Sequence, residues 1–356
     1  MKILRILLLP FAALYGLIVS LRNKFFDWGI FHPEEFTTPI ISVGNLVVGG
    51  TGKTPHIEYL IRLLKESKIA TLSRGYGRKT NHFIEVLETS PAAEVGDEPR
   101  QFKQKFPEVL VCCDTRRVRG IKKINELDSG IDAILLDDAF QHRWVKPGIN
   151  ILLTDYSQLF IDDYMLPTGN LREPRSGALR ADVIVISKSP AVFSPIDRRL
   201  ILQRFKLLPH QKVFFSYLKY GEFIPYPKNE NKNLGFTKEY YFDRRYSVVL
   251  FTGIANTSHL EEYLKGKVKE IIPAAFPDHH QFTIQDLEQV KKTFENITRA
   301  NKLILTTEKD IMRITQPDLL EFVKKLPLFY IPVEVAFHEK DEKEFNKIII
   351  DYVTRN

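Results

Sequence analysis

A glycine-rich segment, GGTGKT at residues 49–54, constrains the fold of this chain more than any other part of its sequence. Glycines let successive backbone N–H groups turn inward on phosphate oxygens, and the helix that follows contributes the positive field of its N-terminus. In the general motif the lysine reaches the β- and γ-phosphates, and the hydroxyl after it binds Mg²⁺. The segment therefore predicts a strand, a phosphate-binding loop and a helix, in that order.

One position departs from the general pattern, which places a further glycine where this chain has Val47. The flanking sequence still fits, because Pro39–Val43 is a short apolar run and Leu60, Leu63 and Leu64 follow with helical spacing. A glycine-rich turn without a ligand is the alternative. We predict that a nucleoside triphosphate and Mg²⁺ are bound, with Lys53 acting on the phosphates. The predicted nucleotide-binding residues are Val47, Val48, Gly49, Gly50, Thr51, Gly52, Lys53 and Thr54.

The length of 356 residues is enough for about two domains. Hydrophobic residues make up 44% and charged residues 27%, which is typical of a folded globular protein and excludes wholesale disorder or a polytopic membrane protein. The net charge of +7 favours anionic partners. Its lysines and arginines are dispersed, without the aromatic-interleaved stripe of single-strand binders, so we expect no nucleic-acid partner. The adjacent Cys112 and Cys113 are not spaced as a metal site or a disulfide framework, which suits a reducing cytosol.

The N-terminus carries an almost entirely apolar run from Ile6 to Leu21. As a helix it would extend roughly 24 Å, less than the roughly 30 Å of a bilayer's hydrocarbon region. Basic residues flank the run on both sides, and four aromatic residues follow between Phe25 and Phe31, as is typical of a helix at the membrane interface. We predict that residues 1–35 form a membrane-associated helix. A cleaved signal peptide and a buried core helix are the alternatives.

The rest of the chain predicts an α/β fold, with a mainly parallel sheet in a nucleotide-binding core and a second, smaller α/β domain. The predicted strands of the core are 39–43, 109–113, 133–136, 149–153 and 183–186. Those of the smaller domain are 247–252, 303–306 and 328–333, with a helical pattern at 284–300. A change in composition to Pro, Lys, Asn and Tyr predicts a linker or hairpin at 221–245, between a core at 36–220 and a smaller domain at 246–356.

Two carboxylates, Asp137 and Asp138, directly follow a buried apolar strand. Nucleotide-binding proteins of this kind usually anchor Mg²⁺ with a carboxylate at the end of a neighbouring strand. We therefore predict a metal site formed by Thr54, Asp137 and Asp138. Taken alone, the pair would equally fit a capping turn.

Three other polar segments are undecided on local grounds. Asp97 lies in a turn-rich segment, where it fits either a helix cap or a general base that accepts a hydroxyl proton. Arg172 and Glu173 form a charged pair beside turn residues, for which a surface ion pair is the plain interpretation. His279 follows Asp278 before a helical segment, where helix capping is the ordinary explanation.

Taken together, these segments resemble the tetraacyldisaccharide 4'-kinases, the lipid A disaccharide kinases of Gram-negative bacteria. The motifs that carry the resemblance run in family order: SVGNL (42–46) into GGTGKTP (49–55), SRGYG (73–77), GDEP (96–99), DDAFQH (137–142), LREP (171–174) and DHH (278–280). The family's loop also lacks the first glycine, so Val47 agrees with it. Ala139 departs mildly, because the family often has glycine there.

The resemblance implies transfer of the ATP γ-phosphate to the 4'-hydroxyl of a tetraacylated glucosamine disaccharide 1-phosphate, giving lipid IVA. It implies that Asp97 is the catalytic base, that His279 orients it, and that domain closure brings the two together. It places Asp137 and Asp138 at the metal. The substrate- or phosphate-contacting residues that it implies are Arg117, Gln141, His142, Arg172 and Glu173. Residues 307–310 also resemble a family segment, without an assigned role.

The partners implied are the acylated disaccharide lipid and the inner-membrane surface, at the cytoplasmic face; no protein partner is evident. An acylated substrate stays in the bilayer, so an interfacial helix and positive charge would help the enzyme to reach it. The main alternative is a membrane-attached ATPase or GTPase switch with the same loop and Mg²⁺ carboxylates. A kinase for a soluble metabolite is the third interpretation.

Overall fold

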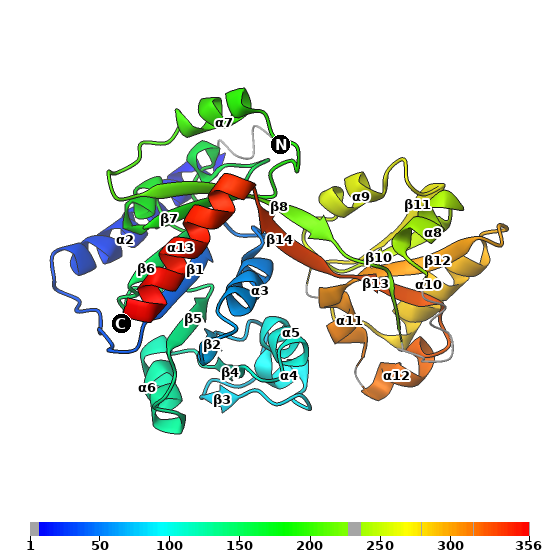
Figure 1. The fold of residues 1–356 in the computed structure, drawn as a ribbon, viewed down its shortest axis with the longest axis horizontal. Helices are drawn as coiled ribbons and strands as arrows, with labels where there is room; N and C mark the ends of the chain where they lie inside the picture. The colour runs from blue at the N-terminus through cyan, green and yellow to red at the C-terminus, as the bar shows by residue number, and fades with distance from the viewer. Residues whose placement is uncertain (1–6, 227–235, 279, 316, 356) are drawn as a thin grey trace.

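The computed structural model describes residues 7–226, 236–278, 280–315 and 317–355. Figure 1 shows two domains side by side, with strands β8 and β14 running from one to the other. Each domain contains a sheet with helices packed against it, so the expected α/β fold class is confirmed. His279, which we expected in the site, lies outside the described residues.

The larger domain contains a nine-stranded sheet in the order β14-β8-β7-β6-β1-β5-β2-β4-β3. All neighbours are parallel except the pairs that bring in β3 and β14 at the two edges. The strands are β1 (Ile40–Asn45), β2 (Ile69–Ser73), β3 (Ile84–Glu85), β4 (Leu110–Cys113), β5 (Ala133–Asp137), β6 (Ile149–Asp155), β7 (Val183–Ser187), β8 (Lys212–Tyr220) and β14 (Val333–Phe337). The central strands are buried on both faces, which explains why they appear in the sequence as continuous apolar runs.

Helices cover both faces of this sheet, as parallel strands require. The helices that pack against its strands are α3 (Lys53–Leu63), α5 (Asp97–Lys105), α6 (Arg117–Leu127) and α13 (Glu339–Arg355). The domain also contains α2 (Leu9–Asp27), α4 (Ala92–Val95) and α7 (Pro195–Leu202), with short 3₁₀ turns at Phe160–Asp162 and Arg175–Arg180. In a parallel sheet, the carboxyl ends of the strands lie at one edge, where ligands usually bind. The segments that leave β1, β2, β5 and β6 carry polar motifs found in the sequence.

The smaller domain contains a five-stranded sheet in the order β11-β10-β12-β13-β9, which is parallel except for β9. Its elements are β9 (Ile224–Tyr226), α8 (Lys238–Asp243), β10 (Ser247–Thr252), α9 (Ser258–Leu264), β11 (Glu270–Ala275), α10 (Ile284–Glu295), β12 (Lys302–Thr307), α11 (Glu308–Ile314), α12 (Pro317–Val323) and β13 (Leu328–Ile331).

The chain passes between the two sheets twice, once after β8 and once between β13 and β14. The two crossings contact each other, because the Gly221 N–H donates to the Pro332 carbonyl at 2.9 Å. After the second crossing, β14 pairs with β8, and α13 packs into the core of the larger domain through Phe345 and Ile349. The expected smaller domain at 246–356 therefore differs from the sheet pairing, which places residues 333–355 with the larger domain. The expected linker at 221–245 likewise includes β9, a strand of the smaller sheet.

Helix α2 leaves a broad apolar surface uncovered. Leu14 and Leu17 are 57% and 65% exposed, and the other large apolar residues exposed along this segment are Leu7, Leu9, Phe11, Ile18, Leu21, Trp28 and Ile30. Only Ala12 and Phe26 are buried in the helix. Within residues 7–226, 236–278, 280–315 and 317–355, none of the helices combines the length and apolar character needed to cross a bilayer.

Candidate active site

The phosphate loop connects β1 to α3, as the sequence predicted. Gly49 has φ +113° and Gly52, which caps the N-terminus of α3, has φ +87°, so both positions favour glycine. Residues 48–54 line a cavity of about 780 Å³ between the two domains. Val47 is buried beside the loop and is not among the lining residues. Behind the loop, burial lowers the pKa of His56 to about 4, so its ring is neutral at neutral pH.

Two cations, Lys53 from the loop and Arg172 from a distant segment, converge on Asp138. Lys53 Nζ lies 3.6 Å from Asp138 Oδ1, and the Arg172 guanidinium donates to both carboxylate oxygens at 3.1 and 3.2 Å. Burial alone would raise the pKa of Asp138, but the two cations hold it below its usual value. Asp138 also has φ +46°, a strained conformation of the kind that concentrates at functional sites.

Asp137 faces the same cavity from the end of β5. Its Oδ2 accepts from Ser73 Oγ at 3.3 Å, while its buried Oδ1 has no partner. Burial, together with Asp138 and Glu98, raises the pKa of Asp137 to about 7. An unpartnered buried carboxylate oxygen beside a second carboxylate fits the oxygen ligands that Mg²⁺ prefers.

The cavity is also lined by Thr54, the third predicted metal ligand. Among the residues that the structure describes, no three His, Cys, Asp or Glu side chains are grouped closely enough to hold a metal ion. Mg²⁺ at nucleotide sites is usually bound by one or two carboxylates plus substrate phosphates, which matches the set found here.

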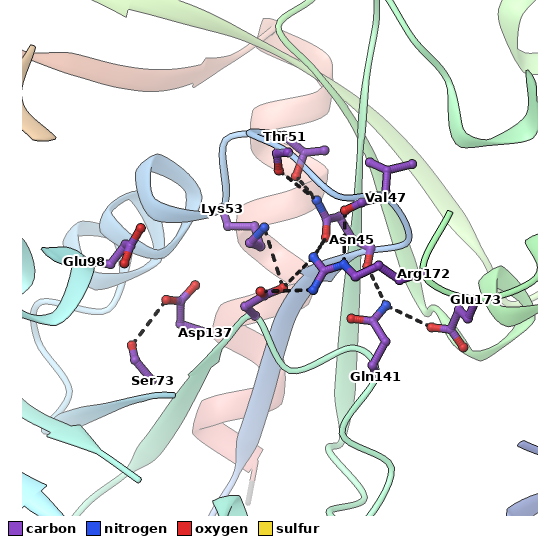
Figure 2. A network of polar contacts seen from close by, with 12 residues as sticks. Asn45, Val47, Thr51, Lys53, Ser73, Glu98, Asp137, Gln141, Arg172 and Glu173 are labelled. Carbon is purple, nitrogen blue, oxygen red and sulfur yellow. Dashed lines mark hydrogen bonds and ion pairs between the residues drawn. The ribbon is translucent and has the colours of Figure 1, made fainter. Parts of the chain in front are cut away.

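Arg172 and Glu173 lie in a network that joins the loop to the N-terminal helix. Arg172 donates to the Val47 carbonyl at 3.2 Å and to the Asn45 side chain. Gln141 Nε2 donates to the Asn45 carbonyl at 2.7 Å and to Glu173 at 3.0 Å, as Figure 2 shows. These contacts bring Gln141, Arg172 and Glu173 together beside the phosphate loop.

Helix α2 reaches the same network from the outside. Asn23 donates to Glu173 at 3.0 Å, Arg22 donates to the Gln141 carbonyl at 3.0 Å, and Tyr15 donates to the Arg172 carbonyl at 2.9 Å. The polar side of the helix is therefore fixed to the site, while its apolar side stays exposed. The sequence did not signal these contacts, because each partner lies more than a hundred positions away.

Arg117 and His142 are brought near the metal-site carboxylates in different ways. Arg117 is almost fully buried and donates to the backbone carbonyls of Asp114 and Asp137, both at 2.9 Å. Burial lowers its pKa to about 10. Arg117 and His142 both line the cavity. Burial, reinforced by Arg117, Arg22 and Arg74, lowers the pKa of His142 to about 4. Phosphate contact by Arg117 stays a prediction.

Asp97 begins helix α5, and its carboxylate contacts the smaller domain. Arg313 from α11 donates to Asp97 Oδ2 through Nε at 2.8 Å and through Nη2 at 2.7 Å. Arg313 is in turn fixed by Asp310 at 3.1 Å and by the Gly253 carbonyl at 2.7 Å. Sequence reasoning missed Arg313, because nothing in its local sequence distinguishes it from a surface arginine.

The segment at residues 307–310, which had no assigned role, supplies further contacts between the domains. Glu308 pairs with Lys105 at 3.0 Å, and Lys309 pairs with Glu98 at 2.9 Å. Thr307, Glu308 and Lys309 also line the cavity. This segment therefore forms the face that the smaller domain turns toward helix α5.

The family model described as tetraacyldisaccharide-1-P 4'-kinase matches residues 4–354 of this chain. The tetraacyldisaccharide 4'-kinase of Flavobacterium johnsoniae is 45% identical over 358 residues, covering 100% of this chain and 99% of its own. That of Phocaeicola vulgatus is 43% identical over 352 residues, covering 98% of this chain and 95% of its own.

A solved structure, the "apo" form of LpxK from Aquifex aeolicus in complex with ATP, matches with a TM-score of 0.73 and 28% sequence identity. The match covers 98% of this chain and 99% of that one. The resemblance noted in the sequence is thus confirmed over the full length, and the switch interpretation is not supported. The chain belongs to the tetraacyldisaccharide-1-phosphate 4'-kinase family and is a kinase.

Proposed function

We propose that this protein transfers the γ-phosphate of ATP to the 4'-hydroxyl of a tetraacylated glucosamine disaccharide 1-phosphate, giving lipid IVA and ADP. The observation that carries the proposal is one cavity between the domains, lined by the phosphate loop, Asp137, Asp138 and Arg172. Its volume of about 780 Å³ lies in the usual range of small-molecule sites. The names of the full-length relatives supply the substrate.

In this reaction the 4'-oxygen attacks the γ-phosphorus, and the bond from that phosphorus to the bridging oxygen of ADP breaks. Asp97 accepts the hydroxyl proton, while Arg313 holds the carboxylate at the domain interface. Lys53 and Arg172, which pair with Asp138 in the structure, would balance charge on the transferred phosphoryl group. His279 as a partner of Asp97 remains part of the proposal from family resemblance alone.

Thr54, Asp137 and Asp138 would hold Mg²⁺. When bound, the ion would neutralise charge on the β- and γ-phosphates. The raised pKa of Asp137 supports this assignment, because a carboxyl that is costly to ionise while buried gains most from a neighbouring cation.

We further propose that the enzyme works at the cytoplasmic face of the bacterial inner membrane, with α2 lying in the interface. Its exposed apolar side chains suit the acyl boundary of a bilayer. Its polar side reaches Glu173 and the Gln141 carbonyl, so a lipid held beside the helix has its headgroup close to the phosphate loop. Acyl chains would then remain in the membrane during phosphorylation.

The test is incubation with γ-labelled ATP, Mg²⁺ and the acylated disaccharide in mixed micelles, followed by separation of lipid from free phosphate. Label in the lipid fraction is expected, and it should be absent with the deacylated sugar at the same concentration. Label found only as free phosphate, at a rate independent of lipid, would favour an ATPase and overturn the proposal.

A further inference from the structure

The two residues at the end of strand β7 bind consecutive carbonyls of the phosphate loop. Ser187 Oγ, which is fully buried, donates to the Thr51 carbonyl at 2.8 Å. Lys188 Nζ donates to the Gly50 carbonyl at 2.5 Å and pairs with Asp155 at 2.8 Å. Lys188 has φ +57°, a conformation that residues with side chains rarely adopt and that tends to persist where function requires it.

The flanking carbonyls of the loop are bound from two other elements. Asn45 Nδ2, at the end of β1, lies 3.4 Å from the Gly49 carbonyl and donates to Thr51 Oγ1 at 2.9 Å. His56 Nδ1, in the first turn of α3, lies 2.7 Å from the Gly52 carbonyl. Four successive carbonyls, from residues 49 to 52, therefore each contact a side chain from outside the loop.

The contact of His56 also defines its tautomer. A carbonyl only accepts, so Nδ1 carries the hydrogen, and Nε2 of the neutral ring accepts from Ser216 Oγ at 3.0 Å. Ser216 lies in β8, the strand that leads into the smaller domain. The loop is thus tied to one of the two connections between the domains.

These contacts matter because the C=O and N–H of one planar peptide point in opposite directions. Fixing the Thr51 and Gly52 carbonyls also fixes the N–H groups of Gly52 and Lys53. Those N–H groups lie at the start of α3, where the first donors of a helix have no partner within it. They are the donors that a phosphate loop presents to its ligand.

We propose that Ser187, Lys188 and His56 are positioning residues for nucleotide binding, which hold the loop peptides in their phosphate-binding orientation before the nucleotide arrives. None of them is required to touch the reacting atoms. The proposal rests on ATP as the nucleotide, but not on the identity of the lipid acceptor.

The experiment is calorimetric titration of the full-length protein with MgADP and with MgATP, which needs no lipid turnover. Ser187→Ala and Lys188→Met should each weaken both nucleotides by roughly tenfold, the effect of losing one hydrogen bond to the loop. The ratio of ATP to ADP affinity should stay unchanged, because the phosphates bound by the loop are common to both. Lys146→Met, at an exposed surface pair, is the matched control.

His56 provides a rescue test. His56→Leu should weaken both nucleotides like the other variants, while His56→Asn, whose amide nitrogen replaces Nδ1 as the donor, should restore affinity to within about threefold. His210→Leu, at an exposed histidine, is the control. Thermal unfolding identifies any variant that fails to fold, and Ser187→Ala and Lys188→Met then decide the question.

Two results would overturn the proposal. One is affinity within twofold of the wild type in folded Ser187→Ala and Lys188→Met proteins. The other is a loss confined to MgATP in Lys188→Met, because this would mean that Lys188 contacts the γ-phosphate directly. These titrations measure nucleotide affinity and do not depend on lipid phosphorylation. The positioning role of these residues can therefore be rejected independently of the proposed lipid kinase activity.

Discussion

Asp97 stands in the first turn of α5, a common place for a capping carboxylate, yet Gly96 occupies the capping position and no side chain caps this helix end. The carboxylate is instead bound by Arg313 across the domain interface. Local sequence could not decide between a cap and a base, since the deciding partner lies 216 positions away. This ion pair places Asp97 at the domain interface, and its assignment as the base rests on family resemblance.

Replacing Asp97 with asparagine keeps the size of the side chain and removes the proton acceptor. We expect kcat for lipid phosphorylation to fall by at least about 10²-fold, the usual contribution of a general base. Affinity for MgATP should stay within about threefold, because the loop is intact. Initial rates and calorimetric titration measure the two effects. Near-normal turnover would remove Asp97 from the mechanism.

His142 predicts a pH dependence of stability. Its pKa is about 4 in the folded protein and about 6.5 in an unfolded chain, so the unfolded state binds more protons between these values. Stability is therefore lost as the pH falls from 6.5 toward 4. The fall in urea midpoint between pH 7 and pH 5 should be smaller in His142→Gln than in the wild type. An equal fall of the urea midpoint in both proteins would mean that folding does not lower the pKa of His142.

At the scale of elements, the sequence predicted the apolar N-terminal helix but not its polar contacts. Its apolar composition predicted a membrane-associated helix, with a buried core helix as one alternative, and the apolar side chains of Leu14 and Leu17 are exposed. The contacts of Tyr15 and Asn23 with the LREP segment were not predictable, because polar residues in an apolar run carry no sign of their partners. Deleting the helix would therefore damage the site as well as membrane binding, and point variants give the cleaner test.

Leu14→Asp combined with Leu17→Asp should weaken binding to anionic phospholipid vesicles by at least about tenfold, because burying one leucine contributes about 2 kcal/mol. Co-sedimentation measures the effect. Activity on a short-chain, micelle-soluble acceptor should be largely retained. Leu127→Asp, at a similarly exposed leucine of α6, is the control. Unchanged vesicle binding would exclude α2 as the membrane contact.

The sheet core was largely predictable, and its edge was not. The strands at 109–113, 133–136, 149–153 and 183–186 were recognised because double burial requires continuous apolar residues. Strands β8 and β14 were missed as members of the larger sheet, since their pairing joins residues more than a hundred positions apart. Helix α13 follows β14 in the chain, so its place in the larger domain was missed as well.

On the scale of the whole molecule, a buried charge cluster connects both domains behind the phosphate loop. Lys105 of α5 pairs with Glu58 of α3 at 2.7 Å and with Glu308 of the smaller domain at 3.0 Å. The Glu58 side chain is fully buried. Gln101 also donates to Glu58 at 2.7 Å. The helix that carries the loop is thus fixed to the same residues that contact the smaller domain.

Lys105→Met should destabilise the protein by about 3 kcal/mol, because it leaves a buried carboxylate without its closest cation. Chemical unfolding in urea measures this loss. Lys291→Met removes the lysine of an exposed Lys–Glu ion pair and should change the free energy of unfolding by less than about 1 kcal/mol. Equal stability of the two variants would show that the cluster around Lys105 does not hold the domains together.

In the function proposed here, a lipid-facing helix and a phosphate loop serve one cavity, in which a single sugar hydroxyl is phosphorylated. The most direct test is the position of the new phosphate, determined by NMR of the product formed from ATP, Mg²⁺ and the acylated disaccharide 1-phosphate. We predict one new phosphomonoester, at the 4'-oxygen. Phosphate at another hydroxyl, or a pyrophosphate at the 1-position, would contradict the account.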